Sequence, residues 1–218
     1  MISITETGLF FLFFSLLVTN PVLAEDHERG DKYQPVRNQL QQCFACHGET
    51  GAPASDATAS EVGKQRIVKT TPVPILAGQE FFYLYTQLKD FKSGLRENEI
   101  MSPIVSSLEK DDMKLIAEYF SEQQWPENNY KASASETNTG KKVIGSAECT
   151  ACHLGAFNGN SRVPRLAGQH PDYMAKTMKD MKNGIRKNAT AMSSLMKTFS
   201  EQEIKAVSAY LAAFKEED

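Results

Sequence analysis

The sequence lacks the side-chain arrangements that identify the common enzyme classes. It contains no phosphate-binding glycine loop and no combination of serine, histidine and aspartate that indicates nucleophilic catalysis. It also has no excess of positive charge, because 24 Lys and Arg stand against 27 Asp and Glu, a formal net charge of −3. Nucleic acids are bound mainly through cationic side chains, so this balance argues against nucleic-acid binding.

Cysteine is scarce, and its placement is informative. The chain has four cysteines, and all of them lie in two motifs, Cys43-Phe44-Ala45-Cys46-His47 and Cys149-Thr150-Ala151-Cys152-His153. A Cys-x-x-Cys-His run is the attachment signature of c-type haem: both thiols add to porphyrin vinyl groups and the histidine ligates the iron. Two copies that use every cysteine predict two covalently bound haem c groups.

Four cysteines could in principle serve three other purposes. Two disulfides would suit an exported protein, but they would not require a histidine in the next position both times. Structural zinc sites use the same residue types in a different spacing. A thioredoxin-like dithiol needs a βαβ context, and none is visible.

Long apolar runs are confined to the N-terminus. The apolar stretch 8–18, followed by Val22-Leu23-Ala24, predicts a secretory signal peptide over residues 1–24 and hence a periplasmic protein. The stretch is too short to span a bilayer comfortably. Its leading segment has no Lys or Arg and carries Glu6, so a retained signal that holds the protein at the membrane periphery is the alternative.

The rest of the chain contains an internal repeat. The segment Pro74-Ile75-Leu76-Ala77-Gly78-Gln79 returns as Pro164-Arg165-Leu166-Ala167-Gly168-Gln169, and Ser93-Gly94-Leu95-Arg96 returns as Asn183-Gly184-Ile185-Arg186. Two copies of one fold predict two domains, at 25–126 and 141–218. A polar stretch rich in Ser, Thr and Asn predicts a linker at 127–140.

Apolar residues at helical spacing predict an all-α fold for each copy. The first copy has expected helices at 36–44, 80–93 and 110–123, and Gly94 ends the second of them. In the second copy only 140–144 remains for an opening helix, while 200–203 forms a capping box that the first copy lacks. The first copy has 27 residues from His47 to Pro74, against 11 from His153 to Pro164, which predicts an inserted surface loop.

The iron ligand opposite each histidine decides the chemistry, since methionine sulfur raises the reduction potential and closes the site. In the first copy Met101, in the loop before the last helix, is the candidate. In the second copy Met192 aligns with Met101, although Met196 would reach the same iron if the loop were locally helical. Three further methionines at helical spacing are predicted to lie in the core: Met174, Met178 and Met181.

Taken together, these motifs resemble the class I cytochrome c fold, and their tandem arrangement resembles the dihaem cytochrome c4 family. The resemblance implies that the carbonyls of Pro74 and Pro164 accept a hydrogen bond from the haem-ligating imidazoles. It also implies electron transfer between a quinol-oxidising complex and a terminal oxidase. The alternatives are a cytochrome subunit of a flavin-dependent sulfide dehydrogenase and a dihaem enzyme such as a thiosulfate dehydrogenase. Methionine in both loops argues against the enzyme.

The two copies differ in charge. Residues 25–130 carry 11 basic and 17 acidic side chains, a net charge of −6, whereas residues 131–218 carry 13 and 9, a net charge of +4. Such a dipole would orient docking to redox proteins. An acidic partner is expected to meet basic residues of the second copy, unless these are only a solvated helix face: Lys176, Lys179, Lys182, Arg186 and Lys187.

Overall fold

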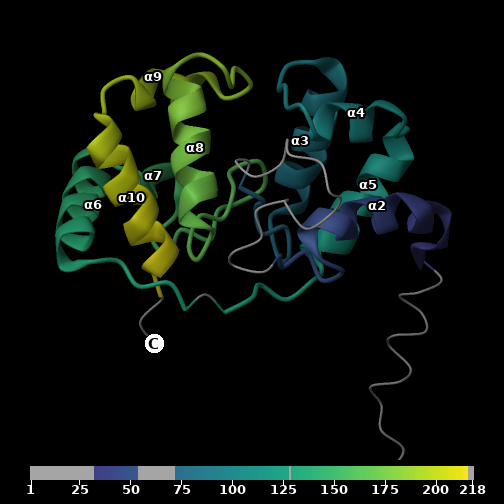
Figure 1. The fold of residues 1–218 in the computed structure, drawn as a ribbon, viewed down its shortest axis with the longest axis horizontal. Helices are drawn as coiled ribbons and strands as arrows, with labels where there is room; N and C mark the ends of the chain where they lie inside the picture. Colours follow the sequence, from purple (N-terminus) through teal and green to yellow (C-terminus); the bar gives the residue numbers. More distant parts are fainter. Residues whose placement is uncertain (1–31, 54–71, 128, 216–218) are drawn as a thin grey trace, which may run out of the picture. The chain divides into compact units, whose positions relative to one another are not determined.

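The computed structural model describes residues 32–53, 72–127 and 129–215; the regular elements named in these ranges are helices, and an isolated β-bridge joins Asn160 and Val163. The order is η1 (Gln34–Val36), α2 (Arg37–His47), α3 (Phe81–Ser93), α4 (Met101–Ser106), α5 (Lys110–Ser121), α6 (Ala134–Ser146), α7 (Thr150–His153), α8 (Pro171–Lys182), α9 (Thr190–Met196) and α10 (Glu201–Ala213). Figure 1 shows α2–α5 in one helical group and α6–α10 in another. The all-α prediction is confirmed.

Two expectations fall outside the described residues. They are the signal peptide at 1–24 and most of the inserted loop between His47 and Pro74. Within the described ranges, no helix combines the length and the apolar character needed to cross a membrane.

The expected helices of the first copy are confirmed, and Gly94 ends α3 in the left-handed conformation with φ of 78°. The expectation for the opening helix of the second copy was wrong. Helix α6 begins at Ala134, inside the stretch predicted as linker. Its start is fixed by Ser133 and Glu136: the Glu136 N–H donates to Ser133 Oγ at 3.2 Å, and the Ser133 N–H donates to Glu136 Oε2 at 3.0 Å. This reciprocal cap satisfies amides that the helix cannot satisfy itself.

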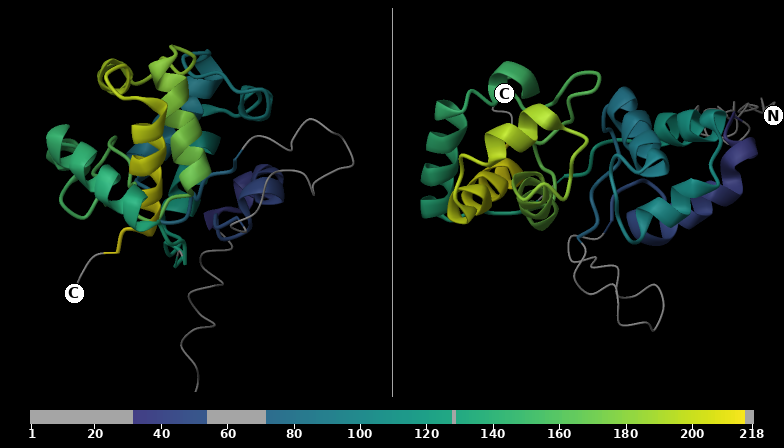
Figure 2. Two further views of the ribbon diagram at one scale, coloured as in Figure 1. Left: turned by 60° about the vertical axis from the view of Figure 1, so that its left-hand side comes forward. Right: turned by 90° about the horizontal axis from the view of Figure 1, so that it is seen from above.

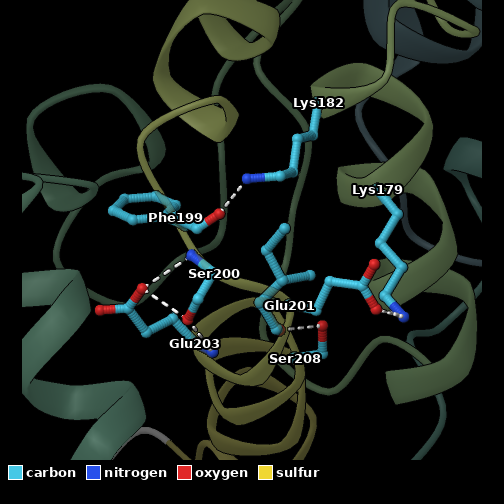
Figure 3. A network of polar contacts seen from close by, with 8 residues as sticks. Lys179, Lys182, Phe199, Ser200, Glu201, Glu203 and Ser208 are labelled. Carbon is cyan, nitrogen blue, oxygen red and sulfur yellow. Dashed lines mark hydrogen bonds and ion pairs between the residues drawn. The ribbon is translucent and has the colours of Figure 1, made fainter.

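The last helix of each copy also begins with a reciprocal cap. At α10, Ser200 and Glu203 exchange the two expected hydrogen bonds, at 3.2 and 2.8 Å (Figure 3). At α5 the expectation that the first copy lacks a capping box was wrong. Glu109 and Asp112 form one there, with the Glu109 N–H donating to the Asp112 carboxylate at 2.8 Å.

The second copy has a continuous apolar core between α6, α8 and α10. The three methionines expected there, Met174, Met178 and Met181, are all buried, so that prediction is confirmed. Helix α10 lies beside α6 in both views of Figure 2. Gly140 is the contact point between them, since a Cβ on this residue would lie 2.6 Å from the Ala206 carbonyl oxygen.

The loop after each histidine turns through left-handed backbone, and the two copies fill the space around it differently. Gly51 has φ of 74°, and a Cβ there would lie 2.7 Å from the ring of Phe120. The equivalent residue of the second copy is Phe157, with φ of 55° and a buried ring. The helix position equivalent to Phe120 is the smaller Leu211, since the carbonyl of each accepts a hydrogen bond from the N–H of a motif glycine, Gly78 or Gly168. The aromatic ring beside this loop therefore comes from the last helix in the first copy and from the loop itself in the second.

Leu154 occupies a backbone conformation that glycine favours. Its φ and ψ are 65° and 168°, close to the 74° and 156° of the equivalent Gly48. Its side chain is 44% exposed, so little burial is lost on removing it. Such backbone strain costs about 1–3 kcal/mol. Glycine relieves it, but glycine also loses more conformational entropy on folding, which offsets part of the gain. We therefore expect Leu154→Gly to raise the free energy of unfolding by about 1 kcal/mol, measured by guanidinium unfolding followed by circular dichroism.

The matched control imposes the same strain on the other copy. Gly48→Leu is expected to lower the unfolding midpoint, because its Cβ would also lie 3.0 Å from the Ala52 carbonyl oxygen. A Leu154→Gly variant that is less stable than the parent protein would show that the leucine side chain stabilises more than its backbone strain costs.

Candidate haem-binding sites

Each Cys-x-x-Cys-His motif ends in a buried histidine that a proline carbonyl holds. His47 is the last residue of α2, and its Nδ1 lies 3.1 Å from the Pro74 carbonyl oxygen. His153 is the last residue of α7, with Nδ1 3.0 Å from the Pro164 carbonyl oxygen. Because a carbonyl can only accept, Nδ1 carries the proton in both rings and Nε2 keeps its lone pair. Both hydrogen bonds expected from the resemblance are present.

Burial keeps both imidazoles neutral. It lowers the pKa of His47 to about 4, against the smaller opposing effect of the Pro74 hydrogen bond. It lowers the pKa of His153 in the same way, with Pro164 opposing. A neutral imidazole with a free Nε2 is the form that ligates a metal.

The four cysteines are free. Burial raises the pKa of the Cys43 thiol to about 11, and it also raises the pKa of Cys46 and Cys149. Reactive redox dithiols have lowered pKa values instead. In the part of the chain that the structure describes, no group of three or more His, Cys, Asp or Glu side chains is placed to hold a metal ion. The donor set of each motif fits haem c, since it offers thiols for the vinyl groups and a neutral imidazole for iron.

The candidate methionines lie on short helices, and not in loops as expected. Met101 begins α4, is half-buried, and its N–H donates to Asn98 Oδ1 at 2.8 Å. Met192 is a half-buried residue of α9 that packs against the second core. Met196 ends the same helix and is 2% exposed within that core. The segment is therefore locally helical, which is the condition under which Met196 competes with Met192. The choice between them stays a prediction.

The glutamines that end the two repeated motifs join the copies in a crossed pattern. Gln169 accepts from the Ile75 N–H at 2.8 Å and donates to the Ile75 carbonyl at 2.9 Å. Gln79 accepts from the Arg165 N–H at 2.7 Å and donates to the Arg165 carbonyl at 3.0 Å. Both glutamines are buried. Sequence reasoning missed this pairing, although a polar residue repeated at the end of an apolar motif was a signal of it.

A second crossed contact pairs arginine with tyrosine. Arg96 donates to the Tyr173 hydroxyl at 3.2 Å, and Arg186 donates to the Tyr83 hydroxyl at 3.3 Å. Burial would raise the pKa of Tyr173. The charges of Arg96 and Arg186, with hydrogen bonds from Arg96 and Thr177, outweigh it and bring that pKa down to about 7. The two copies therefore meet through charged as well as amide groups.

Most of the basic residues expected to dock an acidic partner form hydrogen bonds or ion pairs within the protein. Arg186 is 6% exposed and turned toward the first copy, so its assignment to a docking surface was wrong. Lys182 donates to the Phe199 carbonyl oxygen, and Lys179 pairs with Glu201 at 3.0 Å (Figure 3). Lys92 makes the same contact with the Leu108 carbonyl in the first copy. Lys182 thereby connects α8 to the turn before α10, and Lys92 connects α3 to the turn before α5.

Lys176 also has an internal partner, Asp180, at 2.6 Å. Of the five basic residues proposed for docking, Lys187 is exposed. The positive charge of the second copy can still orient encounters at long range. Arg186 therefore drops out of the expected contact surface, and docking through the four lysines stays a prediction.

Known proteins resemble the chain along most of its length. A family model described as cytochrome c matches residues 137–215. Cytochrome c4 of Pseudomonas aeruginosa is 31% identical over 211 residues, which cover 92% of this chain and 96% of that protein. The thiosulfate dehydrogenase electron acceptor of Stutzerimonas stutzeri is 30% identical over 181 residues, covering 78% of this chain and 77% of that protein.

Solved structures give the same result. The crystal structure of reduced recombinant cytochrome c4 from Pseudomonas stutzeri matches with a TM-score of 0.69 at 28% identity, covering 86% of this chain and 98% of that one. The two copies of the repeat are therefore tandem cytochrome c domains. With its paired Cys-x-x-Cys-His motifs and its likeness to relatives along nearly the whole chain, the protein belongs to the dihaem cytochrome c4 family of electron-transfer cytochromes.

Proposed function

We propose that the protein is a periplasmic electron carrier with one haem c in each domain, accepting electrons from a quinol-oxidising complex and delivering them to a terminal oxidase. The observation that carries this proposal is the duplicated arrangement of a buried histidine whose Nδ1 is bonded to a proline carbonyl. Two such sites in one chain suit the storage and relay of single electrons.

The residues divide the work between attachment, ligation and orientation. When bound, haem supplies a one-electron couple at its iron. His47 with Met101, and His153 with Met192, would ligate the two irons, and methionine ligation would close each site to a substrate. The proline carbonyls orient the imidazoles and increase their basicity. The cysteine pairs attach the groups covalently.

The test is a redox titration of the purified protein, followed in the visible and near-infrared, with haem quantified per chain. We expect two haems per chain, each with a methionine-to-iron charge-transfer band and a positive reduction potential. One haem that lacks the band and binds cyanide readily would contradict the carrier and favour an enzyme. Sequencing the N-terminus of the exported protein tests cleavage after Ala24.

The ligand of the second haem is tested by two matched substitutions. Met192→Leu is expected to remove about half of the near-infrared charge-transfer intensity, because one of two iron–sulfur bonds is lost. Met196→Leu keeps the core volume nearly unchanged and should leave the band intact. An intact band in the first variant and a halved band in the second would assign the ligand to Met196.

A second candidate role is to accept electrons from a thiosulfate-oxidising dehydrogenase. The match to a relative named thiosulfate dehydrogenase electron acceptor favours it. The two roles share the haem sites and differ in the donor. Stopped-flow reduction of the oxidised protein by each donor separates them, since the physiological donor should react faster at low salt. Co-purification with a flavoprotein would instead indicate a subunit of a flavin-dependent sulfide dehydrogenase.

A further inference from the structure

The peptide group between Pro74 and Ile75 has hydrogen bonds at both of its ends. Its carbonyl accepts from His47 Nδ1 at 3.1 Å, and its N–H donates to Gln169 Oε1 at 2.8 Å. The histidine belongs to the first domain and the glutamine to the second. One peptide group therefore connects the haem-motif histidine of the first domain with a buried amide of the second.

The second domain repeats this connection in the opposite direction. The carbonyl of Pro164 accepts from His153 Nδ1 at 3.0 Å, and the N–H of Arg165, in the same peptide group, donates to Gln79 Oε1 at 2.7 Å. Gln79 and Gln169 are 4% and 3% exposed. Solvent therefore does not reach these positions to replace either side-chain amide. Removing one glutamine amide would leave a buried peptide N–H without its acceptor.

Hydrogen bonds in such a chain reinforce one another. An acceptor at the peptide N–H polarises the peptide group and makes its carbonyl a stronger acceptor. The stronger bond to Nδ1–H increases the basicity of the imidazole as a ligand. A more basic axial ligand stabilises the oxidised iron, and hydrogen bonding around the ligands is one of the levers that set haem potentials.

We propose that Gln79 and Gln169 are crossed positioning residues, each of which sets the proximal hydrogen bond and thereby the reduction potential of the haem in the opposite domain. The proposal rests on the proposed function, in that His47 and His153 ligate the two irons. The interface then does more than hold the two domains together, because contact with one domain sets the reduction potential of the haem in the other. Each haem then has the reduction potential of the intact protein only when the two domains are in contact.

The experiment compares Gln169→Leu with Gln79→Leu in the full-length holoprotein. Each removes the acceptor of one peptide N–H and the donor to the carbonyl of the same residue, and each serves as the matched control of the other. Gln169→Leu is expected to shift the equilibrium constant for reduction of the first haem toward the reduced form by up to roughly tenfold, or ~59 mV for a one-electron couple. The second haem should change much less, and Gln79→Leu should give the reverse. The haems are distinguished by their assigned NMR signals, and the Nδ1–H resonance of the affected histidine should move upfield.

The outcomes are decisive in either direction. Potentials that are unchanged, shifted equally, or shifted in the domain that carries the substitution would overturn the proposal. If a leucine variant does not accumulate, Gln169→Glu keeps an acceptor for Ile75, and it should lower the potential of the first haem more than that of the second. An equal shift of both haems there would be a charge effect and would also overturn it. Failure of the proposed function would be seen separately, as a parent protein with fewer than two haems.

Discussion

Replacing Cys149 and Cys152 together by alanine is expected to leave one haem per chain, held by the first domain. Both covalent bonds of the second site are removed, and His153 ends a helix of only four residues, too short to be stable without its haem. In the first domain the motif is the end of an 11-residue helix, on which Phe44 packs 5.4 Å from the ring of Tyr119. Haem absorbance per chain and the intact mass measure the result.

The reciprocal double variant is the control. Alanine at Cys43 and Cys46 should also halve the haem content, with the remaining group in the second domain. Two haems retained in either variant would contradict thioether attachment at these residues. Loss of both haems would contradict independent attachment and would show that one domain cannot mature without the other.

The sequence was sufficient for most of the fold because the helices carry local signals. Apolar spacing located α3 and α5, and Gly94 marked the end of α3. The start of α6 could not be read in the same way, because a stretch rich in Ser, Thr and Asn has the composition of a linker. It is helical because Ser133 and Glu136 cap it and because its apolar residues pack against α10. Tertiary contact overrides weak propensity here.

The haem motifs were readable because their chemistry is local: two thiols and an imidazole within five consecutive residues. The proline hydrogen bonds were expected only through the resemblance, since they join residues 27 and 11 positions apart. The crossed glutamines join residues 94 and 86 positions apart, and the repeated polar residue at the end of each motif does not identify the partner across that distance. Arg186 was misplaced for the same reason. A basic residue after a helix suggests an exposed face, whereas its partners Tyr83 and Gln87 lie in the other domain.

Gly140→Ala is expected to destabilise the protein, although alanine is the better helix former. Helices α6 and α10 approach so closely that the new Cβ would lie 2.6 Å from both the Ala206 carbonyl oxygen and Tyr210 Cβ. The first neighbour is backbone, so relief requires the helices to move apart. Overpacking of this kind costs roughly 1–3 kcal/mol, against about 1 kcal/mol gained in helix propensity. Guanidinium unfolding followed by circular dichroism, at fixed haem content and redox state, measures the difference.

The same helix provides the control. A Cβ at Gly145 would meet nothing within 4 Å, so Gly145→Ala should raise the free energy of unfolding by up to about 1 kcal/mol through propensity alone. Opposite signs for one substitution at two positions of α6 would separate close packing from helix formation. If both variants were more stable than the parent protein, α6 and α10 would lie farther apart at Gly140 than in the structure. The stability of the second domain would then depend more on the haem than on this helix pair.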